Sequence, residues 1–265
     1  MINEMSTVVQ DVGRRLLEIR NTDAIRGEWR GAQLKTEADM LAHSQMSTLL
    51  CALDGSIPVV SEEDLDSQGC LRPERYWLID PIDGTASYSS GYPGFVTQVA
   101  LMEKREPLIA AIYAPAFDHL YLAEKGRGAF LNGERLVVSS QAGRKILIDN
   151  YPEPRGAASV AMRELGFSNY LECGSISLKI CRVADGSADV FFKDVVVRDW
   201  DIAAPHLVLQ EAGGSLNMLD GSPVLYQGSY EKKNGIVASC EKTLCSELVA
   251  WFTRHSAQEH IRRDE

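Results

Sequence analysis

The chain opens with two stretches in which apolar residues recur every three to four positions. This is the spacing of the buried face of an amphipathic helix, and in the first stretch it is kept by Ile2, Met5, Val8, Val9, Val12, Leu16 and Ile19. A second helix is expected from Thr36 to about Leu53. The chain is therefore expected to begin with a pair of helices.

Short β-like runs follow, separated by Gly, Pro or Asn-Gly turn signals. They read IPVV, YWLI, FVTQVALM, LIAAIYA, HLYLAE and GAFLNGERLVV, which is typical of a meander and most simply of an antiparallel sheet. Past about Ser140, strand-like and helix-like segments alternate up to a final helix from about Glu241. Such alternation predicts a sheet covered by helices. We divide the chain loosely into residues 1–140 and 141–265 and expect the halves of this α/β (α+β) protein to pack tightly.

Composition and charge narrow the classes of partner. The 265 residues are 45% hydrophobic and 24% charged, which is enough to bury a sizeable core. The net charge of -10 and the pI near 5.1 argue against a nucleic acid polymer, because phosphate contacts need a Lys/Arg surface. A small anionic substrate would need a positive group in the site, and a bound metal is the obvious candidate.

The N-terminal sequence has no basic segment followed by an apolar core, so it does not resemble a secretory signal. No apolar run approaches the roughly 18 residues of a membrane helix. The six cysteines are scattered, with no Cys-x-x-Cys pair and no histidines at zinc spacing. We expect a cytoplasmic protein without a membrane partner, in which the cysteines are buried reduced thiols.

Acidic residues collect after the predicted strands. SEED spans Ser61 to Asp64, Asp80 and Asp83 follow the next strand, and Asp201 stands at a helix start. Taken one by one, these residues have simpler structural explanations as turn residues, solvated acids or an N-cap.

Together, however, several acids at the ends of apolar strands would repel one another unless a cation stabilised them. Oxygen-rich sites of this kind suit Mg²⁺. The turn Asp-Pro-Ile-Asp-Gly-Thr, which runs from Asp80 to Thr85, also offers backbone N–H groups to a phosphate. The sequence therefore predicts a combined metal and phosphate site.

These residues resemble the inositol monophosphatase superfamily of Mg²⁺-dependent, lithium-sensitive phosphatases, which includes 3'(2'),5'-bisphosphate nucleotidases and class I fructose-1,6-bisphosphatases. The resemblance covers about residues 35–215 and rests, in the family's order, on SEED, WLIDPIDGT, GRGAFLNGERLVVS, GSISLKICRVADGSAD and WDIAAPHLVLQEAGG. It implies a layered αβαβα sandwich, two to three Mg²⁺ ions and a homodimer. The implied reaction is hydrolysis of a small phosphorylated metabolite by water, without a phospho-enzyme.

The resemblance also assigns metal ligands. Glu62 and Asp80, with the carbonyl of Ile82, would hold one metal, and Asp80, Asp83 and Asp201 would hold a second. Glu62 would also help to hold a third, weaker metal, which places it among the catalytic residues.

The remaining roles concern the phosphate and the water. Asp83, Gly84 and Thr85 would bind the phosphate, and Asp39 with Thr85 would polarise the attacking water. Asp39 also follows Thr36 as in a capping box, and one residue can do both jobs.

The expected substrate rim consists of Ser87 with the residues up to 92, Ser175, and the pair Lys193 and Asp194. Lys179 and Lys193 could contact a second phosphate, although exposed lysines are usually solvated. ASY after Gly-Thr matches neither the inositol phosphatase nor the nucleotidase pattern, so an inositol monophosphate or related polyol phosphate and adenosine 3',5'-bisphosphate both stay open.

Two other classes compete with this interpretation. Haloacid dehalogenase-type phosphatases use a nucleophilic aspartate in Asp-x-Asp-x-Thr, but here the spacing is Asp-x-x-Asp-Gly-Thr. A catalytically inactive metal- or phosphate-binding scaffold would be expected to lack a ligand, and every expected carboxylate is present.

Overall fold

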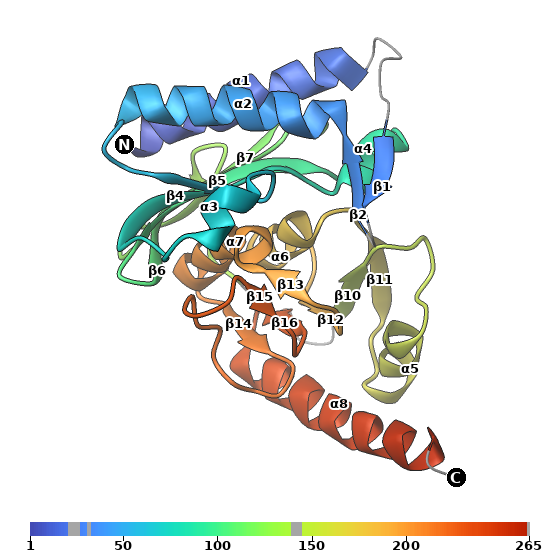
Figure 1. The fold of residues 1–265 in the computed structure, drawn as a ribbon. Helices are drawn as coiled ribbons and strands as arrows, with labels where there is room; N and C mark the ends of the chain where they lie inside the picture. Colours follow the sequence, from blue (N-terminus) through green and yellow to red (C-terminus); the bar gives the residue numbers. More distant parts are fainter. Residues whose placement is uncertain (21–26, 31–32, 139–144, 264–265) are drawn as a thin grey trace.

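The computed structural model describes residues 1–20, 27–30, 33–138 and 145–263. Its helices and two large sheets stack in five layers, helix, sheet, helix, sheet and helix (Figure 1). The layered αβαβα sandwich expected from the sequence is therefore confirmed. The predicted division between residues 140 and 141 lies outside the described residues.

The first sheet contains seven strands in chain order, and it carries the turn with the two aspartates at the end of its second strand. Its strands are β3 (Val59–Ser61), β4 (Arg75–Asp83), β5 (Val96–Glu103), β6 (Glu106–Ala114), β7 (His119–Glu124), β8 (Gly128–Leu131) and β9 (Glu134–Arg135). From β4 onward every neighbouring pair is antiparallel, as the meander pattern predicts, but β3 and β4 are parallel. Because β3 and β4 are parallel, their C-terminal ends lie at the same edge of the sheet.

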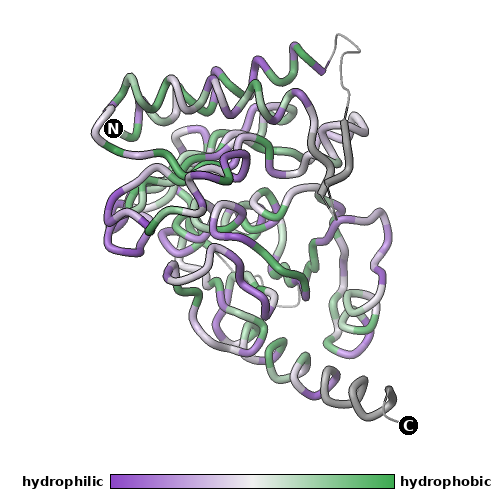
Figure 2. The backbone as a smooth tube through the Cα atoms, viewed as in Figure 1, coloured by the Kyte–Doolittle hydropathy of each residue, from purple (hydrophilic) through white to green (hydrophobic). Residues whose placement is uncertain are grey.

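Both faces of this sheet are buried, so its central strands are almost entirely apolar. On β4, Trp77 and Ile79 pack toward α1 (Ile2–Arg20) and α2 (Glu37–Leu53), which cover the outer face. Tyr76 and Leu78 point to the opposite face, toward α6 (Ile176–Ala184) and α7 (Asp199–Ala212). Figure 2 shows the hydrophobic stretches along the strands and the hydrophilic stretches in many connecting turns.

The second sheet has the order β11-β10-β12-β16-β14 and is mixed. Its strands are β10 (Ile146–Asp149), β11 (Asn169–Glu172), β12 (Val190–Lys193), β14 (Ser215–Met218) and β16 (Ile236–Ser239). α6 and α7 fill the space between the two sheets, whereas α5 (Ala157–Glu164) and α8 (Lys242–Arg263) cover the far face. α6 and α7 thus bring their first turns to the edge where β4 ends.

Several short elements escape the sequence patterns. They are the hairpin β1 (Gly27–Arg30) and β2 (Gln33–Thr36), the helices α3 (Leu65–Gly69) and α4 (Thr85–Ser89), and the two-residue strands β13 (Val197–Arg198) and β15 (Glu231–Lys232). Elements this short do not complete enough of a period to be recognised.

Two findings concern the cysteines and membranes. The six cysteines are free thiols, but Cys51 and Cys70 are exposed, so the expectation that all six are buried is wrong for these two. Cys51 lies on the solvent side of α2, next to the buried Leu50, and Cys70 directly follows the short helix α3, which has no buried residue. Within the described residues, no helix is long and apolar enough to cross a bilayer.

Candidate active site

The end of β4 carries the two aspartates of the Asp-Pro-Ile-Asp turn. The pairing of β4 with β5 shifts register between Asp80 and Asp83, where Pro81 has no N–H to donate to the ladder. Both carboxylates are buried, with 1% and 8% of the residue exposed. The N–H of Ile82 donates to Asp80 Oδ1 at 3.1 Å, which fixes the turn.

Three carboxylates from three elements meet at this edge of the sheet. Glu62 follows β3, Asp80 lies at the end of β4, and Asp201 lies in the first turn of α7. One oxygen of each lies within 4.8 Å of the others. Burial, followed by repulsion from Glu62 and Asp83, raises the pKa of Asp201 well above its usual value. The chain thus concentrates negative charge here, which an added cation would stabilise.

Asp83 lies beside this cluster and is tied to α6. The backbone N–H of Ser177 donates to Asp83 Oδ2 at 2.6 Å. Burial nevertheless raises the pKa of Asp83 to about 6, against the lowering effects of that hydrogen bond and of Lys179. An acid that is buried in this way has its ionised form stabilised if a cation binds next to it.

The donor set fits Mg²⁺. Its atoms are carboxylate oxygens, the ligands that hard divalent cations prefer, and within the described residues no sulfur or imidazole joins Glu62, Asp80 and Asp201. Burial raises the pKa of Asp83 and of Asp201 against the lowering effects of Lys179 and of Arg198 respectively, so these cations do not fully offset the cost of ionising the two acids. The expected carbonyl ligand, the oxygen of Ile82, lies 3.2 Å from Thr85 Oγ1.

Thr85 and Asp39 are in contact across two segments of the chain. Thr85 Oγ1 donates to Asp39 Oδ1 at 3.0 Å. The other oxygen of Asp39 accepts from the N–H and the hydroxyl of Thr36, both at 2.6 Å, so the capping box at the start of α2 is present as well. Asp39 is fully buried, and it therefore fixes the direction of the threonine hydroxyl.

The glycines near Thr85 allow three loops to approach closely. Gly84 has a φ of +93°, which glycine adopts without strain. A Cβ on Gly174 would lie 2.1 Å from the carbonyl oxygen of Gly94 and 2.4 Å from Ser87 Oγ. Ser175 caps the start of α6, where its Oγ accepts from the N–H of Leu178 at 2.9 Å. Two expected rim residues therefore lie at the close approach of Gly174 to Gly94. Ser87 faces Gly174, and Ser175 follows it in the chain.

The two lysines considered as contacts to a second phosphate are already bonded within the chain. Lys179 is fully buried and donates to Asn150 Oδ1 and, at 2.8 Å, to the carbonyl of Gly174. Burial lowers its pKa to about 8. Lys193 pairs with Asp149 Oδ1 at 2.8 Å. Asp194, by contrast, is exposed.

Sequence reasoning missed the residues that hold α6 and α7 in place. Gln98, buried on β5, accepts from Ser177 Oγ at 2.7 Å and donates to the carbonyl of Trp200 at 2.8 Å. It therefore joins the first turns of both helices to the first sheet. A glutamine inside the otherwise apolar run FVTQVALM was the available signal.

A second missed feature is a buried ionic cluster next to Asp201. Asp199 is fully buried and pairs with Arg72 at 2.7 Å and with Lys232 at 2.9 Å. The guanidinium of Arg72 also lies 3.9 Å from the centre of the Tyr230 ring. The three charged residues are so far apart in the sequence that no local pattern reveals them.

Comparisons with known proteins place this site in a family. The chain matches the inositol monophosphatase family over residues 3–257. It is 32% identical over 219 residues to an inositol monophosphatase of Dictyostelium discoideum, covering 78% of this chain and 80% of that protein.

Two further relatives carry other names. The 3'(2'),5'-bisphosphate nucleotidase CysQ of Aggregatibacter actinomycetemcomitans is 30% identical over 200 residues, covering 72% of this chain and 74% of its own length. The crystal structure of the extragenic suppressor protein SuhB of Bartonella henselae superposes with a TM-score of 0.79 at 26% identity, covering 94% and 96% of the two chains. The chain belongs to the inositol monophosphatase family.

Proposed function

We propose that the protein is a Mg²⁺-dependent phosphomonoesterase that hydrolyses a small phosphorylated metabolite by direct attack of water. The observation that carries this proposal is the meeting of Glu62, Asp80 and Asp201 beside the pair Thr85 and Asp39. This arrangement combines a cation site with a hydroxyl that can orient a water. Membership of a family of phosphomonoesterases supports it.

The carboxylates and the threonine would have separate tasks. Divalent metals in such sites bind phosphate oxygens, lower the pKa of a water and stabilise the leaving oxygen. Glu62, Asp80, Asp83 and Asp201 would hold two to three of them. Because Asp39 accepts the Thr85 hydroxyl proton, the Thr85 oxygen has a lone pair free to accept a hydrogen bond from the attacking water.

For the substrate, we favour an inositol monophosphate or a related polyol phosphate. Lys179 and Lys193 are both bonded to groups of the chain itself, so a second phosphate would have to displace Asn150 or Asp149. Asp194, which follows Lys193 in the chain, is exposed and offers acceptor oxygens that suit hydroxyl groups better than a second phosphate.

Adenosine 3',5'-bisphosphate is the second candidate. It is favoured by Lys179 and Lys193, which place two cations close to Asp149 and Asn150. The relative named as a bisphosphate nucleotidase points the same way. In that case Lys193 would exchange Asp149 for the second phosphate.

A panel of phosphate esters separates these candidates. Inositol 1-phosphate, adenosine 3',5'-bisphosphate, fructose 1,6-bisphosphate and histidinol phosphate are assayed with Mg²⁺ and after EDTA. We expect activity that depends on Mg²⁺, is partly supported by Mn²⁺ and falls with Li⁺ or Ca²⁺. Full activity after exhaustive EDTA treatment contradicts the metal mechanism. Absence of activity on every phosphate monoester contradicts the proposed enzyme and favours the catalytically inactive scaffold.

The same panel with Lys193→Ala tests the choice between one and two phosphates. If the substrate carries a single phosphate, the ranking of the four esters is unchanged. If Lys193 binds a second phosphate, hydrolysis of adenosine 3',5'-bisphosphate falls selectively.

A substrate with a chiral phosphorus distinguishes direct attack of water from a phospho-enzyme. One displacement by water inverts the configuration at phosphorus, and two displacements through a phospho-enzyme retain it. We also expect a homodimer, which sedimentation equilibrium measures.

A further inference from the structure

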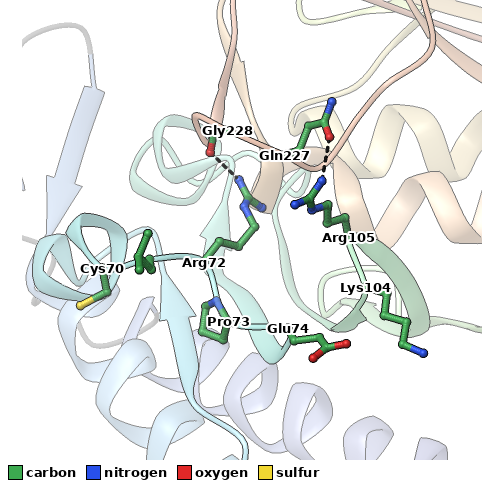
Figure 3. A pocket seen from close by; sticks show the side chains of 9 residues that line it. Cys70, Arg72, Pro73, Glu74, Lys104, Arg105, Gln227 and Gly228 are labelled. Atoms are coloured by element: carbon green, nitrogen blue, oxygen red, sulfur yellow. Dashed lines mark hydrogen bonds between the residues drawn. The ribbon is translucent and has the colours of Figure 1, made fainter.

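A second cleft lies outside the carboxylate cluster, and its lining is basic. It has a volume of about 980 Å³, at the upper end of the range of small-molecule sites. Its wall combines the α3–β4 loop, the β5–β6 turn and segment 227–228 (Figure 3). Three of the lining residues are cations, Arg72, Lys104 and Arg105, and one is an acid, Glu74. A positive cleft is unexpected on a chain with a net charge of -10.

In the part of the chain that the structure describes, the cations at the turn have no carboxylate partner of their own. The two acids beside them are paired elsewhere, Glu103 with Arg75 at 3.1 Å and Glu106 with Lys125. Among the described residues, no ion pair involves Lys104 or Arg105, and Arg105 donates to the amide oxygen of Gln227 at 3.1 Å. Both charges thus remain available to an added anion.

The base of the cleft carries a further positive charge. Arg72 and Lys232 share the single carboxylate of Asp199, so one of these two charges is uncompensated. Arg72 reaches the cleft through Nη2, which donates to the carbonyl of Gly228 at 3.4 Å. Figure 3 shows the side chains of Arg72 and Arg105 both reaching toward segment 227–228.

The backbone of the β5–β6 turn is strained by the residues it contains. Lys104 and Arg105 have φ values of +50° and +70°. A two-residue hairpin of this kind favours Asn-Gly, and the left-handed conformation costs an ordinary residue about 1–2 kcal/mol. An Asn-Gly pair would relieve this backbone strain. The presence of lysine and arginine instead indicates that these two side chains have a function.

We propose that this cleft is a second binding site, distinct from the carboxylate cluster, for a small organic anion with a dianionic phosphate group. Arg105 and Arg72, whose side chains both reach toward segment 227–228, bind the phosphate, and Lys104 adds a positive charge at the same turn. The rest of the ligand packs on Leu71, which is 96% exposed, and on Pro73. A neighbouring cavity of about 470 Å³ is lined by Cys70, Arg72 and Gly228, which also line the cleft, and by Glu62. This cavity therefore connects the cleft to the carboxylate cluster.

An amide NMR titration of the full chain in Mg²⁺ with phenylphosphonate tests this proposal, because the probe resists hydrolysis and carries an apolar ring. Leu71, Arg105 and Gln227 report on the cleft, and Thr85 and Ser177 report on the carboxylate site. We expect saturable shifts of the cleft amides. Methylphosphonate, which lacks the ring, is expected to bind less tightly at the cleft.

The decisive variant is Lys104→Asn with Arg105→Gly. It removes both charges and supplies the pair that the turn geometry favours, so the melting temperature stays equal or rises. The dissociation constant at the cleft is expected to rise at least about tenfold, since one charged hydrogen bond contributes that much, while shifts at Thr85 and Ser177 are retained. Arg127→Gln, an exposed charge on another hairpin, is the matched control. Cleft amides that do not shift, or that shift equally in the variant, overturn the proposal.

Discussion

Asp199 and Asp201 lie in the same helical turn of α7, and their surroundings are opposite. Asp199 is fully buried between the two cations Arg72 and Lys232, at 2.7 and 2.9 Å. Asp201 faces Glu62 and Asp83, and burial together with their repulsion raises its pKa well above the usual value. Burial raises the pKa of Asp199 as well, against the lowering effects of Lys232 and Arg72. The two acids therefore differ in the charges around them, because two cations pair with Asp199, whereas two acids outweigh Arg198 beside Asp201.

This difference distinguishes a carboxylate that pairs with cations of the chain, Asp199, from a carboxylate in the candidate metal site, Asp201. Both residues would pass as helix-start acids in the sequence, and both are aspartates at the first turn, where negative charge suits the helix dipole. Only the neighbouring charges distinguish them. Asp199 is the counter-ion of two cations of the chain, whereas an acid surrounded by other acids marks a candidate site for an added cation.

The largest expected effect comes from exchanging the two acids for their amides. Asp199→Asn leaves Arg72 and Lys232 buried without a counter-ion, and loss of one partner of a buried ion pair costs about 3–5 kcal/mol. Asp201→Asn removes a repelled carboxylate, so the metal-free protein becomes more stable at pH 7. Urea unfolding in EDTA measures both changes.

Activity is expected to respond differently. Asp201→Asn loses at least about 100-fold in activity, because even residues behind the metal ligands contribute 10- to 100-fold. Asp199→Asn retains Mg²⁺-dependent turnover at temperatures where it remains folded. If both variants destabilise the metal-free protein equally, the distinction between the two acids is wrong.

The next effect concerns the hydroxyl rather than the charges. Thr85→Val keeps the shape of the side chain but removes the group that Asp39 orients. We expect turnover to fall by about 10²-fold or more, in the range of a lost proton-transfer group, with Mg²⁺ binding nearly unchanged. Thr85→Ser, which keeps a hydroxyl, serves as the control, and equal activity of the valine and serine variants would exclude the role assigned to Thr85.

A smaller effect follows from the pKa of Asp83, which burial raises from 3.8 to about 6. Between these values the folded metal-free protein holds a proton that the unfolded chain has released, so its unfolding free energy falls as the pH rises from about 4 to 6. Mg²⁺ requires the ionised carboxylate. Its apparent affinity should therefore increase by about tenfold between pH 5 and pH 7.

Thermal-shift titrations with Mg²⁺ at a series of pH values measure this dependence. Asp83→Asn is the matched variant, since it carries no proton to release, and its weaker affinity should change less across the same range. An affinity of the wild type that is independent of pH contradicts the assignment of Asp83 to the metal site.

The sequence predicted best what is local. Asp80, Asp83, Gly84 and Thr85 lie within six residues of one another, so a single turn reveals their chemistry. Long strands such as β6 and β7 were also recognised, because apolar runs between turn signals are complete within the segment itself.

What the sequence did not predict depends on distant partners. The cluster of Arg72, Asp199 and Lys232 joins three segments, and each residue alone resembles a solvated surface charge. Lys179 was considered as a group that contacts a second phosphate, yet it is fully buried and bonded to Asn150. A lysine is rarely buried completely unless it is paired, and the pairing becomes visible only in the folded chain.

Calorimetric titration of Mg²⁺ into the metal-free protein tests the central claim most directly, because it measures the missing cation without assuming any substrate. Wild type and Asp199→Asn should bind Mg²⁺ with similar affinity at a temperature where both are folded. Asp201→Asn should bind at least about tenfold more weakly. Equal binding to wild type and Asp201→Asn, or no binding to either, would contradict the assignment of this acidic cluster as the metal centre.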